Sequence, residues 1–212
     1  KGASVVVAMG FAMADAVGTV AAEYPDVNFT IIDVGWLDGK NIQQIEFREQ
    51  EGSFLVGMIA AMKSESGTIG FVGGMEIPLI KRFFAGYEQG ARYINSSIKI
   101  IENYTGTTNE AWNNPTKGAE LAKAQIDKGA DVVYHAAGGT GIGVLQAAAD
   151  AGVYGIGVDK NQNHLHPGSV LTSMLKRVDN AVYDAFQSTM DGSYKTGVFS
   201  YGLAEEGVGW SL

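Results

Sequence analysis

The residues best suited to chemistry are charged side chains that follow apolar segments. Asp159 ends one apolar run, and Lys176 comes just after another, the run 169–174. Asp15 lies at the start of a segment with helical periodicity. A carboxylate and an ammonium group that face one crevice can bind hydroxyl groups, which both donate and accept hydrogen bonds. This pattern favours a ribose or sugar ligand, although a charge that stabilises the first turn of a helix explains Asp15 equally well.

Two aromatic residues lie where a flat ligand could stack. Trp112 belongs to the polar segment 107–115, just after an apolar run, and Phe11 holds the equivalent place near the N-terminus. A large aromatic side chain in such a position is either a lid over the core or a stacking platform. The two rings, contributed by two lobes, could sandwich one flat ring, and we expect Trp112 to act as a platform.

The glycine-rich segment 138–143 follows a further apolar run, but it does not have the spacing of a dinucleotide fingerprint. Between a strand and a helix, this segment offers backbone N–H groups, at positions such as Gly139 and Gly141, to a polar ligand. The alternative is a tight turn where a helix packs closely on a strand. Both interpretations stay open from the sequence.

Catalytic and metal chemistry have little support. The chain has no cysteine, no GxSxG nucleophile elbow and no Walker lysine after a glycine loop. His164 and His166 form an HxH pair in a Gly/Pro/Asn-rich loop, but no further ligand follows at a diagnostic spacing, so a solvated loop is the favoured interpretation. We therefore expect neither an enzyme nor a bound metal or cofactor.

Short β-branched runs alternate with helical periods along the whole chain, and this alternation predicts an α/β fold with parallel sheets covered by helices on both faces. Ligands of such sheets bind at the carboxyl ends of the strands. The polar segment 63–67 is a candidate crossing between two lobes. About eight strands are expected, at 4–9, 28–33, 42–47, 68–72, 99–104, 131–135, 154–159 and 169–174. Helices are expected around 13–24, 54–62, 84–94, 115–126, 142–149 and 178–186.

Length and composition limit the class of protein. The 212 residues suffice for one large domain or two small lobes, and the formal charge of −8 argues against a partner as acidic as nucleic acid. With 46% hydrophobic and 18% charged residues, the composition is that of a globular chain, and no apolar run is long enough to span a membrane. The two ends carry neither a signal peptide nor a polar tail, so truncation at both ends is expected.

Several short motifs, in order along nearly the whole chain, resemble the basic membrane protein (BMP) family, the solute-binding lipoproteins of ABC importers. The run 70–75 (GFVGGM), followed by 83–90 (FFAGYEQG), carries the first resemblance. Further similar segments are 50–57 (QEGSFLVG), 114–118 (NPTKG), 129–133 (GADVV), 137–141 (AGGTG), 155–162 (GIGVDKNQ) and 171–177 (LTSMLKR).

The resemblance implies a periplasmic-binding-protein fold of the ribose-binding type, in which two doubly wound α/β lobes are joined by a hinge. Residues 1–66 would form part of the first lobe, 67–160 the second, and 161–212 the crossing back. Asp15 would then grip a nucleoside from the first lobe and Trp112 would stack on the base. Gly141 would contribute a backbone contact beside the ligand. Asp159 would bind the ribose hydroxyls, and Lys176 would lie near the same sugar.

The function implied is that of a monomeric receptor, which captures a purine nucleoside such as inosine, guanosine or adenosine and delivers it to an ABC permease. The family's purine-reading segment and lipidated cysteine would precede Lys1, and the anchored receptor would lie in the periplasm or on the outer face of the cytoplasmic membrane. The alternative is a sugar- or other small-molecule-sensing effector domain of a regulator, because regulators reuse this fold. An enzyme on a doubly wound sheet is the third possibility.

Overall fold

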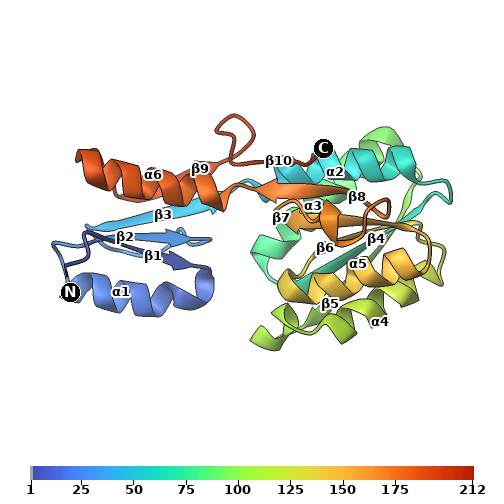
Figure 1. Cartoon of the computed structure of the whole chain (residues 1–212), viewed down its shortest axis with the longest axis horizontal. Helices are drawn as coiled ribbons and strands as arrows, with labels where there is room; N and C mark the ends of the chain where they lie inside the picture. Colours follow the sequence, from blue (N-terminus) through green and yellow to red (C-terminus); the bar gives the residue numbers. More distant parts are fainter. Residues whose placement is uncertain (1) are drawn as a thin grey trace. The chain divides into compact units, whose positions relative to one another are not determined.

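The computed structural model describes residues 2–212, which form two compact units (Figure 1). Unit 1 comprises the chain up to Arg48 together with Arg177–Gly207. Unit 2 comprises Glu49–Lys176 and Val208–Leu212. The chain therefore passes from one unit to the other after Arg48, after Lys176 and after Gly207. Each unit has a mostly parallel sheet of its own and is described by itself.

Unit 1 is a four-stranded parallel sheet in the order β1-β2-β3-β9. Two helices cover opposite faces of this sheet (Figure 1). Its core is a small hydrophobic cluster that joins strand residues such as Phe29 and Ile31 to Val17 of the first helix. The elements are β1 (Val5–Met9), α1 (Ala14–Glu23), β2 (Asn28–Ile32), β3 (Ile42–Phe47), α6 (Val178–Asp191) and β9 (Gly197–Tyr201).

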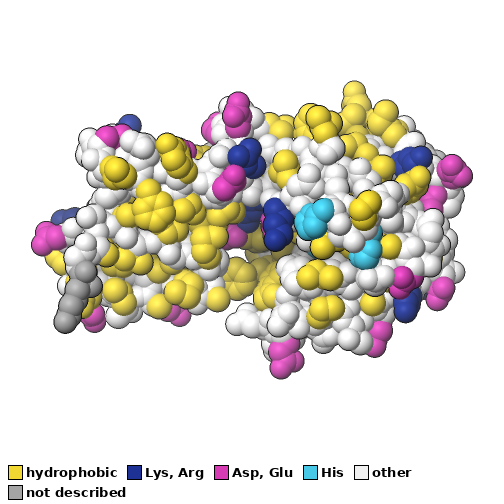
Figure 2. Space-filling model, in the orientation of Figure 1, with side chains coloured by type: hydrophobic (Ala, Val, Ile, Leu, Met, Phe, Trp, Pro, Cys, Tyr) yellow, Lys and Arg dark blue, Asp and Glu magenta, His cyan; other side chains and the backbone are white. Residues whose placement is uncertain are grey.

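Unit 1 leaves many apolar side chains uncovered. Figure 2 shows hydrophobic side chains gathered over the strands and α6 on the visible face. Tyr183 and Met190 lie on one face of α6 and are 66% and 83% exposed. Most of the large hydrophobic side chains that are exposed among residues 2–212 belong to unit 1, although it is the shorter unit.

Unit 2 is a six-stranded sheet in the order β10-β8-β7-β6-β4-β5, with α2 and α3 on one face and α4 and α5 on the other (Figure 1). All neighbouring strands are parallel except β10, which runs antiparallel to β8. The strands are β4 (Thr68–Met75), β5 (Lys99–Gly106), β6 (Val132–Ala136), β7 (Tyr154–Asp159), β8 (Val170–Lys176) and β10 (Val208–Trp210). The helices are α2 (Glu49–Lys63), α3 (Pro78–Ile94), α4 (Pro115–Ile126) and α5 (Gly141–Asp150).

The core of unit 2 contains a cluster of buried aromatic rings. Tyr87 and Tyr134 lie with ring centroids 5.0 Å apart, and Phe71 makes an edge contact with Tyr134 at 5.6 Å. Glycine lets α2 and α3 approach closely, because a Cβ atom at Gly90 would lie only 1.9 Å from the carbonyl oxygen of Phe54. The result is a helix pair packed backbone against backbone on one face of the unit 2 sheet.

The predicted alternation of strands and helices is confirmed, with element ends within a few residues of expectation over most of the chain. Asn114 caps α4, accepting a hydrogen bond from the Lys117 backbone N–H at 3.0 Å. Two of the ten strands formed by the described residues were not predicted, namely β9 and β10. Both strands are short, with glycine at their start or centre, and their pairing comes from distant neighbours in sequence.

The division into units differs from the ranges 1–66, 67–160 and 161–212 expected from the sequence. Helix α2 belongs to unit 2 because its small residues pack against α3, and β8 stays there because it pairs with β7. The candidate crossing at 63–67 is instead a turn within unit 2. The Asp131 carboxylate accepts hydrogen bonds from Ser64 Oγ at 2.6 Å and from the Ser66 backbone N–H at 2.7 Å. No helix among residues 2–212 combines the length and apolar character that a membrane crossing requires.

Candidate ligand-binding site

The carboxyl edge of the unit 2 sheet collects five of the seven predicted site residues. Asp159 ends β7 and Lys176 ends β8, and Asp159 lies in register with Leu175, the residue before Lys176. Gly139 and Gly141 follow β6, which neighbours β7. Trp112 follows β5 and reaches back to β4. The predicted residues thus come from consecutive positions across one sheet, as the rule for open α/β sheets requires.

Asp159 sits on a tight turn with an unusual backbone. Its φ is +67°, a left-handed value that is uncommon for residues other than glycine and is best tolerated by Asn and Asp. The Lys160 backbone N–H donates to the Val158 carbonyl oxygen at 2.8 Å, directly across Asp159. This pattern fits a classic γ-turn, which is rare and strained. The turn leaves the Asp159 residue exposed at the end of a buried strand.

Lys176 is held by a buried carboxylate that the sequence analysis did not single out. The Lys176 Nζ lies 3.7 Å from Glu49 Oε1, and Arg82 Nε donates to Glu49 Oε2 at 2.9 Å. The side chains of Glu49, Lys176 and Arg82 are 0%, 6% and 37% exposed. Burial raises the pKa of Glu49, and the nearby cations Lys176 and Arg82 oppose that rise without cancelling it.

One signal in the sequence could have identified Glu49. It lies at helical spacing from Ser53, Val56 and Ala60, which are all buried residues of α2. A carboxylate in line with an apolar face must find a cation, because an unpaired buried charge is costly. The helix was predicted to begin its apolar period at Phe54, so this position was missed.

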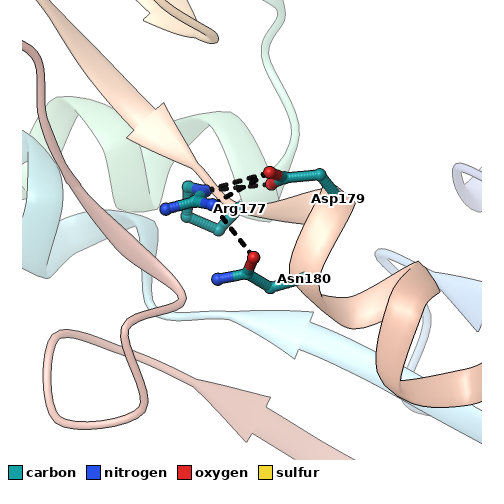
Figure 3. A network of polar contacts seen from close by, with 3 residues as sticks. All are labelled: Arg177, Asp179 and Asn180. Carbon is teal, nitrogen blue, oxygen red and sulfur yellow. Dashed lines mark hydrogen bonds and ion pairs between the residues drawn. The ribbon is translucent and has the colours of Figure 1, made fainter. Parts of the chain in front are cut away.

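Arg177, the residue after Lys176, has a different role. Its guanidinium group donates from Nε to Asp179 Oδ1 at 3.0 Å and from Nη2 to Asp179 Oδ2 at 2.9 Å (Figure 3). Nη2 also donates to Asn180 Oδ1 at 2.9 Å. The hydrogen bond from Arg177 lowers the pKa of Asp179. The Arg177 side chain thus pairs with side chains in the first turn of α6 in unit 1, whereas Lys176 is paired with Glu49 in unit 2.

Trp112 ends the 3-10 turn η2 (Asn109–Trp112) and is half-buried. Its indole ring lies on the backbone of Gly74 in β4, where a Cβ atom would come within 2.1 Å of the ring. The buried Thr140 hydroxyl fixes the adjoining backbone, since it donates to the Ala111 carbonyl oxygen at 2.7 Å and accepts from the Asn114 N–H at 2.7 Å. The position of the ring is therefore fixed by its contacts. Because Trp112 is half-buried, it can be either a stacking platform for a ligand or a lid over the core.

Gly141 has a packing role. The segment Gly138–Thr140 forms the 3-10 turn η3, and the Gly141 N–H is hydrogen-bonded within that turn. A Cβ atom at Gly141 would lie 1.9 Å from His135 Nδ1. Gly139 is half-buried beside the Trp112 carbonyl oxygen. These contacts explain why glycine is needed where this turn packs closely against its neighbours. A ligand contact from Gly139 or Gly141 stays a prediction.

Phe11 and Asp15 belong to unit 1. Gly10, with a φ of +85°, turns the chain at the end of β1, and Phe11 opens the 3-10 turn η1 (Phe11–Met13). Phe11 is half-buried and packs partly on the unit 1 core. Asp15 is exposed in the first turn of α1, a favourable place for a negative charge.

Metal binding finds no support in the part of the chain from residue 2 to residue 212. No group of three or more His, Asp or Glu side chains there is arranged to hold an ion. His164 lies in the exposed 3-10 turn η4 (Asn163–Leu165), and the half-buried His166 follows it. The loop assignment made for this HxH pair from the sequence therefore agrees with the structure.

Two units, each with a parallel or mostly parallel sheet covered by helices, form the architecture of solved substrate-binding proteins. A solved ABC transporter solute-binding protein from Aeropyrum pernix K1 superposes with a TM-score of 0.89 at 33% identity, covering 99% of this chain and 60% of that one. The chain belongs to the Bmp family, described as ABC transporter substrate-binding protein PnrA-like, which matches residues 1–211. The resemblance and the fold class that the motifs predicted are both confirmed.

Two relatives illustrate the family. Basic membrane protein D of Borreliella burgdorferi (strain JD1) is 37% identical over 212 aligned positions, which cover 96% of this chain and 61% of the relative. The ABC transporter nucleoside-binding protein BmpA of Lactococcus lactis (strain MG1363) is 35% identical and is covered to 64%, with all of this chain matched. The chain thus spans about three-fifths of the length of these curated relatives.

Proposed function

We propose that this protein is a receptor that captures a purine nucleoside, with inosine, guanosine and adenosine as candidate ligands, and delivers it to the permease of an ABC importer. The observation that carries this proposal is the position of Asp159 and Lys176 at the ends of two adjacent strands. The two hydroxyls of a ribose can both donate to one carboxylate, and an ammonium group donates to their oxygens.

Trp112 supplies the second part of the proposal. An indole ring seated on Gly74 at the same sheet edge is suited to stack on a flat heterocycle, which separates a nucleoside from a simple sugar. Backbone atoms of Gly139 and Gly141 would lie beside the ligand, and Asp15 and Phe11 would contribute from unit 1. The relative from Lactococcus lactis, named a nucleoside-binding protein, supports the same ligand class.

We propose further that the protein binds and releases its ligand without a chemical reaction, and that no cofactor takes part. The charged and aromatic groups assigned to the ligand are suited to hold it, and none of them forms a nucleophile–base pair. The receptor would act as a monomer in the periplasm or on the outer face of the cytoplasmic membrane, with a lipid anchor upstream of Lys1. This location follows from the proposed delivery to a permease.

A calorimetric screen tests the proposal. The protein is titrated with inosine, guanosine, adenosine, the free bases, ribose and hexoses, and the solutions are then analysed for products. We expect nucleosides to bind most tightly, free bases more weakly, and all ligands to be recovered intact. Release of free base at a catalytic rate would contradict the receptor function. Binding of a pentose or hexose without nucleoside binding would favour a sugar-sensing protein instead.

A further inference from the structure

The completely buried His135, on β6, contacts two of the segments that carry proposed ligand-binding residues of unit 2. Its Nε2 lies 3.0 Å from Gln162 Oε1, and Gln162 is buried in the loop that follows Asp159. The other side of the ring lies against Gly141, where α5 begins. His135 therefore links the glycine turn before α5 to the Asp159 loop.

The hydrogen bonds fix the orientation of the Gln162 amide and the tautomer of His135. The Val158 backbone N–H donates to Gln162 Oε1 at 2.8 Å, and a backbone N–H can only donate. The amide atom that faces Val158 must therefore be the oxygen. Because this same oxygen faces His135 Nε2, that nitrogen must carry the hydrogen. His135 Nδ1 is then a bare acceptor, and it has no hydrogen-bond partner among residues 2–212.

The other end of Gln162 is also fixed. Its backbone N–H donates to Ser173 Oγ in β8 at 2.9 Å, and Ser173 Oγ donates to Asn163 Oδ1 at 2.9 Å. Gly157 leaves the space for the amide, since a Cβ atom there would lie 2.8 Å from Gln162 Oε1. Gln162 thus ties β7 to β8 and, through His135, to β6.

These contacts enclose the γ-turn at Asp159. Val158 is held on one side of the turn and Gln162 on the other, both by buried hydrogen bonds. A left-handed residue in a strained turn persists only where its surroundings determine its conformation. The buried position of His135 also lowers its pKa to about 4, so the ring stays neutral and keeps its single donor near neutral pH.

We propose that His135 and Gln162 are positioning residues, which hold the γ-turn so that the Asp159 carboxylate is presented in one orientation. The assignment rests on the proposed function only in the step that gives Asp159 the ribose as its partner. The conformation of the turn itself does not depend on any ligand. The two parts can therefore be tested separately.

The test uses two matched variants and two readouts. Gln162→Met keeps the size of the side chain and removes the acceptor, whereas Gln162→Glu keeps an acceptor oxygen for Val158 and His135. In the ligand-free protein, we expect the Val158 amide of Gln162→Met to exchange its hydrogen at least about tenfold faster than in the wild type, because its hydrogen bond is lost. Affinity for inosine should fall by about tenfold, with a much smaller change for hypoxanthine, and Gln162→Glu should restore both.

Each outcome decides a different step. Unchanged Val158 exchange in Gln162→Met would overturn the positioning role, whether or not nucleosides bind. Faster exchange of the Val158 amide, together with equal losses of affinity for inosine and hypoxanthine, would mean that His135 and Gln162 have only a general structural role. If the wild type binds no nucleoside, the proposed function fails while the exchange measurement still tests the turn. Long-range ¹⁵N spectra of the wild type need no variant, and an Nδ1–H tautomer at neutral pH would contradict the hydrogen-bond assignment.

Discussion

The two units support their proposed ligand-binding residues in different ways. In unit 2 each such residue rests on a buried polar group: Glu49 lies beneath Lys176, Gln162 beneath the Asp159 turn, and Thr140 beside the Trp112 segment. In unit 1, Asp15 is exposed on the first turn of a helix, and Phe11 packs partly on a small hydrophobic core.

Because of this difference, substitutions in the two units should affect ligand binding and protein stability in different proportions. A buried polar group of this framework cannot be changed without disturbing the fold of its unit, because its hydrogen-bond or ion-pair partners are left buried and unpaired. An exposed residue on a helix turn can be changed with little effect on folding. Under the proposed function, the ligand-binding residues of unit 2 are therefore preorganised by their own unit, and substitutions of the proposed unit 1 residues should affect binding alone. The following substitutions test this contrast between the two units.

The largest effect is expected for Glu49→Gln. The substitution removes the buried carboxylate from its ion pairs with Lys176 and Arg82. Breaking a buried ion pair from one side costs about 3–5 kcal/mol of unfolding free energy. Urea unfolding measures the loss. Glu88→Gln, which removes the exposed i,i+4 pair with Arg92, is the matched control and should cost no more than about 0.5 kcal/mol. Equal losses for the two variants would contradict a buried framework in unit 2.

His135 is expected to make the free energy of unfolding fall by about 2–3 kcal/mol between pH 7 and pH 4.5. Burial lowers the pKa of His135 to about 4, below the value of about 6.5 for an unfolded chain. Between these values the unfolded state binds more protons, so the contribution of His135 to stability is complete above pH 6.5 and is lost as the pH falls towards 4. Urea unfolding at pH 7 and pH 4.5 should show a steeper loss for wild type than for His135→Gln. The exposed His164→Gln is the control and should follow wild type. A parallel loss in all three proteins would refute a buried neutral His135.

Trp112 should affect binding by about 1–3 kcal/mol if it is a stacking platform. Trp112→Phe keeps an aromatic face and should retain most of the nucleoside affinity, whereas Trp112→Ala should lose it. Calorimetric titration and thermal unfolding without ligand are measured on both variants. A large drop in the apo Tm of Trp112→Ala, with affinity kept in the folded fraction, would make Trp112 a lid over the core.

The smallest effect on stability is expected for Asp15→Asn in unit 1. The loss of one exposed charge near a helix N-terminus costs about 0.3–1 kcal/mol. Nucleoside affinity should nevertheless fall, because the carboxylate is proposed to contact the ligand. An unchanged affinity would leave Asp15 with only its helix-stabilising role.

The fold could be predicted from the sequence because its strands and helices have strong local patterns. Buried parallel strands such as β7 are continuous apolar runs, and helix starts such as Asn114-Pro115 have recognisable capping residues. The strands β9 and β10 have no such pattern, since they are short and are stabilised by pairing with β3 and β8. Local sequence does not encode partners that lie so far along the chain.

The candidate site was predictable only in part, for a related reason. Asp159, Lys176 and Trp112 follow apolar runs, so their place at a sheet edge could be inferred from spacing. The groups that hold them could not, because Glu49 and Gln162 act through contacts with residues more than ten positions away, such as Lys176 and His135. The unit boundaries were misplaced for the same reason, since the close packing of α2 on α3 depends on glycines in two separate helices.

The Asp159 carboxylate is proposed to bind the ribose of a nucleoside, and the substitution Asp159→Asn tests this contact. Asparagine tolerates the left-handed backbone of this turn, so the substitution changes the charge and one acceptor without forcing the chain to move. Calorimetric titration of wild type and variant with inosine and hypoxanthine gives two affinity ratios. Since charge-assisted hydrogen bonds contribute about 1.5–3 kcal/mol each, inosine should bind roughly ten- to a hundredfold more weakly to the variant, and hypoxanthine should change much less. Equal losses for the two ligands, or an unchanged affinity for inosine, would contradict the account.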